Sequence, residues 1–393
     1  MSKIRQEFTV PFKYYVEFTE RLFMPENPVF KQTVSPTSDS ITPKVLFVFD
    51  GGMADHHPGL MEQIRSYSSA AGSFEIVETP VVIPGGEQAK NRPEYVQKIL
   101  DAIEAADLDR HSYVTVIGGG AVTDTAGYSA AIAHRGIRLI RVPSTVLAQN
   151  DAAVGVKNGV NAYGKKNFLG TFAPPHAVLN DATFLTTLND RQWRSGISEA
   201  VKVALIKDKD FFEELCKNAA ALNMRDMEAM KSLVYRCAEL HLEHISTSGD
   251  PFERGSSRPL DFGHWVAHKL EQLTDYRVLH GEAVAIGITL DVIYSNLLGY
   301  ITVEDRDRVI QLFQDCGFTL YEPELESALD QPEKKESILH GLQEFREHLG
   351  GELTIMLLDR IGKGIEVHEV NLKLYREAIK QLRNIEKEVV NPE

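Results

Sequence analysis

The sequence predicts a two-domain α/β protein, with a parallel-sheet domain over residues 45–185 and a mainly α-helical domain over residues 186–393. Three observations support this prediction. A chain of 393 residues exceeds what one small hydrophobic core holds. Buried-strand patterns followed by glycine turns and helices recur up to about residue 180, which is typical of a parallel sheet. Helical periodicity dominates from about 190 to 345. Residues 1–44 are an N-terminal extension.

The elements of the first domain follow in order. "VLFVFDGG" predicts a buried strand that ends at Asp50 and two glycines. "SYVTVIGGG" repeats this order, with a strand at Val114–Ile117, a turn at Gly118–Gly120 and a closely packed helix from Asp124. "IRLIRVPST" (137–145) predicts another strand and turn, and 149–172 a long loop without apolar periodicity.

The second domain reads as a series of helices separated by Gly and Pro. Its clearest helical segments are "SEAVKVALI", "FFEELCKNAAAL", "MEAMKSLVYRCAELHLEHI", "HWVAHKLEQL" and "AVAIGITLDVIYSNLLG". We expect the boundary near residues 180–190 to form a cleft, the usual place for a cofactor and a substrate.

Composition narrows the class of function. There are 42 Lys and Arg against 56 Asp and Glu, a net charge of −14, which disfavours a nucleic-acid partner and requires any phosphate site to be a local basic cluster. Three cysteines without CxxC spacing fit a reducing, cytoplasmic compartment. We also expect no signal peptide and no membrane span, because no apolar run approaches the ~20 residues that a span needs.

Several motifs of the first domain have both a structural and a functional interpretation. "GGGAVTD" lacks the third glycine of GxGxxG, so it is either a plain tight turn or a close backbone approach to a pyrophosphate. Asp50 could accept from a ribose, although an N-cap is the simpler interpretation. Glu87 and Lys90 lie in a glycine turn that reads most simply as a surface loop.

Charged residues in two further stretches suggest an anionic substrate. The glycine-rich stretch 149–172 contains Asp151, Lys157, Lys165, Lys166 and Asn167. It is either a solvated surface loop or a binding site for an anionic substrate, and the lysines among the glycines favour the binding site.

Glu199 and Lys202 share one face of an otherwise apolar helix. They are either a weak surface ion pair or charges that face a pocket.

Three histidines come close together in "GHWVAHKL" and "LHGEAVAIG". His264 and His268 share a helical face, and His280 stands at the start of the next helix. One such histidine is more often a core residue, but two imidazoles with an upstream carboxylate form a common catalytic metal set. No Glu follows His264, so the HExxH pattern of metalloproteases is absent. Spacing alone favours a metal site without assigning its ligands.

Taken in order, these motifs resemble those of the dehydroquinate synthase-like family of sugar-phosphate cyclases. The shared order is GGG-x₃-D, R-G, P-[ST]-T, D-x₅-K, G-K-K-N, E-x₂-K, F-G-H-x₃-H and L-H-G-E, from Asp50 to Gly287. Each motif is weak by itself, whereas eight in one order are specific.

The resemblance implies a Rossmann-like NAD domain followed by a helical metal-binding domain, and it assigns roles by position. Implied metal ligands are Glu199, His264 and His280, with zinc the expected ion and cobalt possible. Implied NAD contacts are Asp50, Glu87, Lys90, Gly119, Gly120, Asp124, Ser144 and Thr145. Implied substrate or catalytic residues are Arg135, Asp151, Lys157, Lys166, Asn167, Lys202 and His268, the last beside the departing phosphate.

The implied activity is 3-dehydroquinate synthase-like: an NAD- and metal-dependent lyase that converts a phosphorylated keto sugar into a carbocycle. Transient oxidation, loss of phosphate, reduction and aldol closure leave no net redox change. We expect a homodimer, since two-fold dimers are the commonest assembly.

The sequence departs from the family's dehydroquinate-forming members near the substrate. Asp261 stands where they have Asn, Arg258 is one position away from their arginine, and no lysine corresponds to theirs around "HLEHIS". Like-charge repulsion would weaken carboxylate binding. One alternative is therefore a cyclase for a non-carboxylated heptulose or hexose phosphate. A second is a metal-dependent polyol dehydrogenase of the same fold, which would release NADH, although Glu199 and the lysine-rich loop favour the cyclase.

Overall fold

The computed structural model describes residues 3–34, 42–252 and 259–390. The chain divides into two compact units. Unit 1 comprises residues 1–144 and 156–183, and unit 2 comprises residues 145–155 and 184–393. Arg258 lies outside the described residues.

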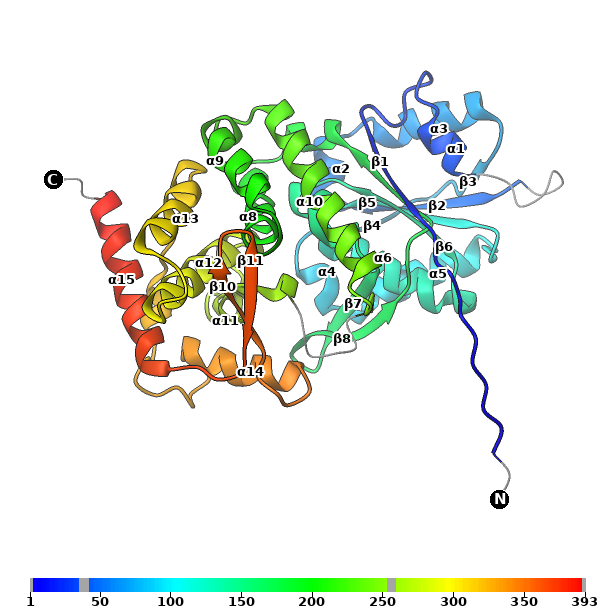
Figure 1. Cartoon of the computed structure of the whole chain (residues 1–393). Coiled ribbons are helices and arrows are strands. Elements are labelled where there is room, and N and C mark those ends of the chain that lie inside the picture. The colour runs from blue at the N-terminus through cyan, green and yellow to red at the C-terminus, as the bar shows by residue number, and fades with distance from the viewer. Residues whose placement is uncertain (1–2, 35–41, 253–258, 391–393) are drawn as a thin grey trace. The chain divides into compact units, whose positions relative to one another are not determined.

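Unit 1 is built on a seven-stranded parallel sheet, as the sequence predicts (Figure 1). The strand order is β1 (Tyr15–Thr19), β9 (Ala177–Asp181), β6 (Arg138–Pro143), β5 (Tyr113–Gly118), β2 (Lys44–Asp50) and β3 (Glu75–Ile76), with β4 (Val81–Ile83) also paired to β2. Part of the N-terminal extension thus supplies a terminal strand of the sheet.

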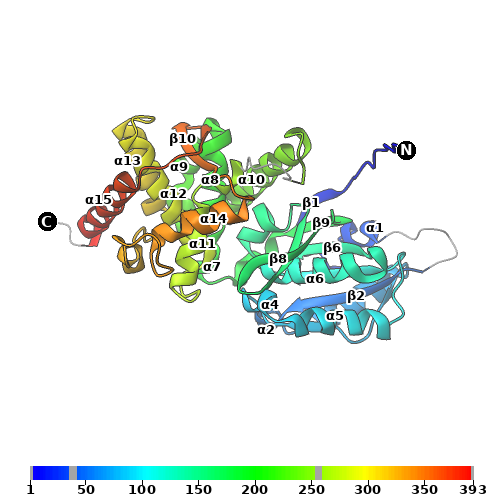
Figure 2. The same ribbon diagram turned by 90° about the horizontal axis from the view of Figure 1, so that it is seen from below.

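Strand β2 shows how both faces of the sheet are buried. Leu46 and Val48 lie in an aliphatic cluster with side chains of α5 (Pro93–Ala105) and α6 (Gly120–Ile132). The alternate residue Phe47 points to the other face and stacks on Phe30, with 5.8 Å between ring centroids. Helices on both faces explain why the strand reads as a continuous apolar run (Figure 2).

The described part of unit 1 also contains four further α-helices and an antiparallel hairpin. They are α1 (Val29–Thr33), α2 (Gly51–His56), α3 (Leu60–Ala71), α4 (Gln88–Asn91), and the antiparallel pair β7 (Lys157–Ala162) and β8 (Lys165–Phe172). The prediction of a long loop at 149–172 is therefore wrong. Most residues of β8 are exposed, so its strand carries no apolar alternation that could have revealed it.

Unit 2 is mainly helical, as predicted. Its helices are α7 (Asp190–Ser195), α8 (Ile197–Lys207), α9 (Lys209–Asn223), α10 (Met227–Thr247), α11 (His264–Leu273), α12 (His280–Leu297), α13 (Val303–Asp315), α14 (Gly341–His348) and α15 (Leu372–Val390). A hairpin of β10 (Ile355–Arg360) and β11 (Lys363–Val367) completes it, and a π-helical turn at Ala148–Ala152 belongs to this unit.

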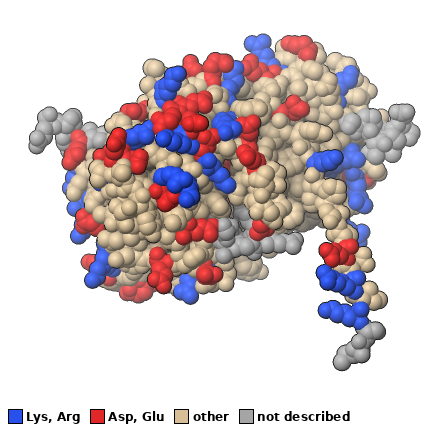
Figure 3. Space-filling view, viewed as in Figure 1, with Lys and Arg blue, Asp and Glu red and all other residues tan. Residues whose placement is uncertain are grey.

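Two further observations concern membranes and surface charge. Within the described ranges, no helix is both long enough and apolar enough to cross a bilayer. On the face shown in Figure 3, basic and acidic side chains are interspersed, and the visible described atoms form no continuous basic surface.

Candidate active site

Glycines at the starts of α11 and α12 fix where two of the histidines stand. Gly263 has φ +78°, and a Cβ there would lie 2.6 Å from the backbone nitrogen of Ile288 on α12. A Cβ on Gly281 would lie 1.8 Å from the carbonyl oxygen of Ser195. Only glycine permits these approaches, so each helix begins close against its neighbour, with His264 and His280 as the first helical residues.

Glu199, His264 and His280 converge in unit 2, as the resemblance implied. The Nε2 atoms of His264 and His280 lie 3.6 and 3.5 Å from Oε1 of Glu199. One ligand atom from each of the three residues lies within 4.8 Å of the others. Glu199 is fully buried on α8, so the interpretation of Glu199 and Lys202 as a surface ion pair is wrong.

The charges around Lys202 are unusually dense for a buried region. Its ammonium contacts Glu199 and lies 3.9 Å from Asp151 Oδ1. Burial would lower the pKa of Lys202, but Glu199, Asp151 and also Asp261 raise it above its ordinary value. These neighbours favour the protonated ammonium of Lys202, which can neutralise an oxyanion.

Both carboxylates beside Lys202 stay ionised. Burial would raise the pKa of Glu199, but Lys202, His264 and His280 hold it well below its ordinary value. Burial opposes ionisation of Asp151 as well, and Lys202 and His241 hold its pKa below the usual range.

The donor set fits a divalent cation. Two imidazoles and a carboxylate are ordinary ligands of a catalytic metal with an open position. Both carboxylate oxygens of Glu199 are buried. Apart from the ion pair with Lys202, they accept no hydrogen bond of ordinary geometry from the described residues. In addition, the carboxyl groups of Glu199, Asp151 and Asp261 all lie close enough to the single ammonium of Lys202 to raise its pKa. A divalent cation would help to neutralise this group of carboxyls.

His268 lies next to both metal-ligand candidates. Its ring centroid is 5.5 Å from that of His264 and 5.9 Å from that of His280, onto which it stacks. The structure thus brings all three histidines together, with His268 beside the set that includes Glu199.

Two residues of this cluster escaped the sequence analysis. His241 on α10 places Nδ1 2.9 Å from Asp151 Oδ1, and Glu271 on α11 places Oε2 3.1 Å from Nδ1 of His280. Glu271 could have been found, because His264, His268 and Glu271 follow i, i+4, i+7 spacing on one helical face. His241 begins the stretch "HLEHIS", which lacks the family's lysine, but nothing in that stretch linked it to Asp151.

The glycine turn of unit 1 lies between β5 and α6. Gly119 is the N-cap of α6 and offers no capping side chain, and the helix begins at Gly120 rather than at the predicted Asp124. The N-terminus of this 13-residue helix has no capping side chain of its own, which suits a pyrophosphate, but the Gly119 N–H donates to Asp50 Oδ2 at 3.3 Å. Asp50 caps α2, accepting from Gly52 N at 2.9 Å, so the capping interpretation is confirmed.

Side chains around this turn pair with one another. Lys90 Nζ lies 2.7 Å from Asp124 and also contacts the Asn167 side chain. Glu87 accepts from the Asn161 side chain at 2.6 Å. The structure therefore gathers three of the implied cofactor residues, Glu87, Lys90 and Asp124, with the hairpin residues.

The other implied residues are spread more widely. Ser144 is buried and donates its backbone N–H to Gly118 at 2.9 Å, whereas Thr145 belongs to unit 2. Lys157 is exposed at the start of β7, and Lys166 lies in β8. Arg135 is exposed and follows α6, so it stands at the opposite end of that helix from Gly120.

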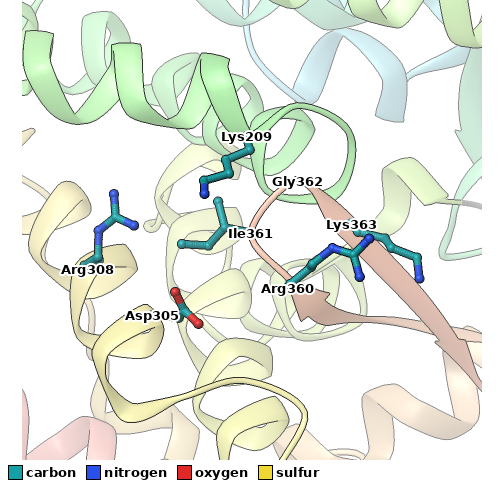
Figure 4. A pocket seen from close by; sticks show the side chains of 7 residues that line it. All are labelled: Lys209, Asp305, Arg308, Arg360, Ile361, Gly362 and Lys363. Atoms are coloured by element: carbon teal, nitrogen blue, oxygen red, sulfur yellow. The ribbon is translucent and has the colours of Figure 1, made fainter.

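A pocket of about 540 Å³ lies elsewhere in unit 2 (Figure 4). It is lined by Lys209, Asp305, Arg308, Arg360, Ile361, Gly362 and Lys363, none of which belongs to the cluster. Acidic neighbours already partner three of its four cations: Glu213 lies 2.6 Å from Arg308, and Asp359 lies 3.4 Å from Arg360 and 3.1 Å from Lys363. The pocket therefore shares no lining residue with the set of Glu199, His264 and His280.

Comparison with known protein families shows which family the chain belongs to. Residues 80–195 match the 3-dehydroquinate synthase N-terminal model, and residues 196–335 match the 3-dehydroquinate synthase C-terminal model. The chain belongs to the 3-dehydroquinate synthase family of sugar-phosphate cyclases. The matched regions include both the glycine turn and the histidine cluster, so the recognition from sequence is confirmed.

Individual members of the family agree with this assignment. The 3-dehydroquinate synthase of Solibacter usitatus is 33% identical over 368 residues, 93% of this chain and 98% of its own. That of Pseudomonas savastanoi pv. phaseolicola is 35% identical over 314 residues, 77% of this chain and 83% of its own.

A solved structure is similar over nearly the whole chain. ValA, the 2-epi-5-epi-valiolone synthase of Streptomyces hygroscopicus subsp. jinggangensis 5008, has NAD+ and Zn2+ bound. It is 28% identical, with a TM-score of 0.84, and the match covers 97% of this chain and all of ValA (100%). Relatives with two different products therefore share this fold, and the family alone does not name the substrate.

Proposed function

We propose that this protein is an NAD- and divalent-metal-dependent cyclase that converts a phosphorylated keto sugar into a carbocycle with loss of phosphate. The observation that carries the proposal is the set of Glu199, His264 and His280 beside Lys202, in which Glu199 and His264 are buried and His280 is partly exposed. When bound, the metal supplies Lewis acidity at a substrate oxygen, and NAD takes up and returns a hydride.

The side chains of unit 2 would hold and neutralise the substrate. Lys202, protonated at neutral pH, would donate to an oxygen that gains negative charge during the reaction. Asp151, ionised under the same conditions, would accept from a substrate hydroxyl. His268 would act beside the departing phosphate, as the resemblance implies.

The residues of unit 1 would serve the cofactor and the phosphate group. We assign NAD to Asp50, Glu87, Lys90, Gly119, Gly120, Asp124 and Ser144, together with Thr145 of unit 2. We assign the phosphate and hydroxyl groups to Arg135, Lys157, Lys166 and Asn167. The uncapped start of α6 supports the first assignment, and the cations of β7 and β8 support the second.

We further propose zinc as the metal, because a His₂Glu set with an open position is a common zinc site. The zinc in ValA supports this choice. We also propose a homodimer working in the cytoplasm, on the symmetry and cysteine arguments above.

For the substrate, we propose a sugar phosphate without a carboxylate, such as a heptulose or hexose phosphate. Asp261 adds a negative charge close enough to Lys202 to raise its pKa. A carboxylated substrate would meet that charge, whereas a hydroxyl could donate to it. The similarity to ValA, whose product differs from dehydroquinate, is consistent with this choice.

Rates with carboxylated and non-carboxylated substrates test this assignment. Phosphate release would be measured for the heptulosonate phosphate used by dehydroquinate synthases, a heptulose phosphate and a hexose phosphate. We expect kcat/KM to favour a non-carboxylated sugar, and Asp261→Asn to shift the ratio toward the heptulosonate by about tenfold, or ~1.4 kcal/mol. Preference of the unaltered enzyme for the heptulosonate would make it a dehydroquinate synthase.

A further inference from the structure

Glu271 lies where a second layer of residues around the metal would be expected. Its side chain is nearly buried, on the same face of α11 as His264 and His268. The carboxylate oxygen Oε2 lies 3.1 Å from Nδ1 of His280. Since a carboxylate can only accept, Nδ1 of His280 carries the proton and donates it.

The two nitrogens of the His280 ring therefore face different partners. Nδ1 faces Glu271, while Nε2 lies 3.5 Å from Glu199 Oε1. Fixing the proton on Nδ1 leaves the lone pair of Nε2 available to a metal. In metal sites generally, an acceptor at the second ring nitrogen fixes the tautomer and orientation of the ligand histidine.

His264 is arranged in the same way with a weaker acceptor. Its Nδ1 donates to the backbone carbonyl of Phe262 at 3.1 Å, and its Nε2 faces Glu199. Both imidazoles thus present Nε2 to the same carboxylate oxygen. Of the two histidines, His280 has a carboxylate rather than a carbonyl as its acceptor, which makes its imidazole the more basic ligand.

We propose that Glu271 is a positioning residue, which orients His280 and strengthens it as a metal ligand. This inference rests on the proposed metal site at Glu199, His264 and His280. Glu271 would not contact the metal in this arrangement, because it binds Nδ1 of His280 whereas Nε2 faces Glu199. The alternative is a second site formed by His268, Glu271 and His280, whose ligand atoms also lie within 4.8 Å of one another.

Metal affinity and the ligand field distinguish these possibilities without relying on activity. Metal-free wild type, Glu271→Ala and Glu271→Gln would be titrated with Zn2+ against a chromophoric chelator and, separately, with Co2+ followed by visible absorption. We expect one ion per chain in wild type and a loss of Zn2+ affinity of about 10–100-fold for Glu271→Ala. Glu271→Gln retains a neutral acceptor, so its loss of Zn2+ affinity should be smaller. The Co2+ absorption spectrum should change in both variants.

Glu344→Gln is the matched control. Glu344 on α14 holds the same helix through Lys269, with 2.7 Å between its carboxylate and the ammonium, but it contacts no ligand candidate. This change should lower the melting temperature while Zn2+ affinity stays within about twofold, the limit we set for an unperturbed ligand set.

Three results would overturn the inference. The first is a Zn2+ affinity of the Glu271 variants that equals that of wild type or falls no more than that of Glu344→Gln. Glu271 would then have no positioning role. Two ions per wild-type chain would make it a ligand instead. Wild type that binds no divalent metal would remove the proposed function itself.

Discussion

The histidine cluster of unit 2 and the glycine turn of unit 1 are both short motifs, but the chain builds them differently. The cluster consists of side chains, and its donor atoms already face one another within one compact unit. The turn consists largely of backbone, and the charged side chains beside it, Lys90, Asp124 and Glu87, pair with neighbours in unit 1.

This difference predicts different sensitivities. In the cluster, helix register and the close approach of Gly263 and Gly281 fix each ligand, so losing one side chain removes a large part of the site. At the turn, backbone N–H groups would carry the binding, so single side-chain changes should cost less. The predictions below run from the largest expected effect to the smallest.

Glu199→Gln should have the largest effect, because it removes a ligand candidate and the main partner of Lys202, whose side chain is only 2% exposed. Removing one partner of a buried ion pair costs ~3–5 kcal/mol in general, and Asp151, 3.9 Å from the ammonium, should offset part of this loss. We expect loss of stoichiometric Zn2+ binding, loss of phosphate release and a lower melting temperature.

A second change separates these causes, because Lys202→Met removes the ammonium and leaves all three ligand candidates in place. It should lower the melting temperature and abolish phosphate release, since Asp151 and Asp261 lose their cation, but it should keep stoichiometric Zn2+ binding. Wild-type metal affinity in Glu199→Gln would show that the cluster is not the metal site.

The pH dependence of stability should reveal another buried carboxyl near the cluster. Asp291 accepts from Trp265 and Tyr375, and burial raises its pKa to about 7. Its folded-state pKa lies above the unfolded value of 3.8. Its stabilising contribution is therefore complete below about 3.8 and is lost as pH rises toward about 7.

Asp291→Asn should flatten the fall in unfolding free energy between about pH 4 and pH 7, by at most ~4 kcal/mol. Thermal or urea unfolding of both proteins across this range measures the slope. Equal slopes would mean that Asp291 is ionised in the folded protein throughout.

Lys90→Met tests the turn with a moderate expected effect. It removes the ammonium that neutralises Asp124, which would leave an unpaired carboxylate beside the expected pyrophosphate. We expect the Kd for NAD to rise about tenfold, or ~1.4 kcal/mol, with Zn2+ affinity unchanged. Lys98→Met, which removes a donor to the Val82 carbonyl, is the control, and an equal loss of NAD affinity there would argue against a specific role for Lys90.

Asp50→Ala should have the smallest effect on stability, ~1 kcal/mol, the usual value for an N-cap. Chemical unfolding measures this loss, and Asp50→Asn should retain most of the cap because the amide oxygen can still accept. If Asp50→Asn also keeps the NAD affinity of wild type, the carboxylate serves the fold rather than the ribose.

The sequence predicted those parts of the molecule whose signals are local. Strands such as β2 and β5 are recognisable as apolar runs that precede glycines. Spacing and the family resemblance identified His264, His268 and His280. The sequence did not predict the hairpin of β7 and β8. Most residues of β8 are exposed, so the strand has no apolar alternation and forms through its hydrogen bonds to β7. His241 was missed because only packing brings α10 against Asp151.

The most direct test of the account is a balance of products with purified enzyme, NAD, a divalent metal and the best sugar phosphate. Inorganic phosphate and absorbance at the NADH band would be followed in one reaction. The account predicts one phosphate per carbocycle with no lasting NADH, because the hydride returns to the substrate. NADH that accumulates without phosphate would contradict it and make the histidine cluster the metal site of a dehydrogenase.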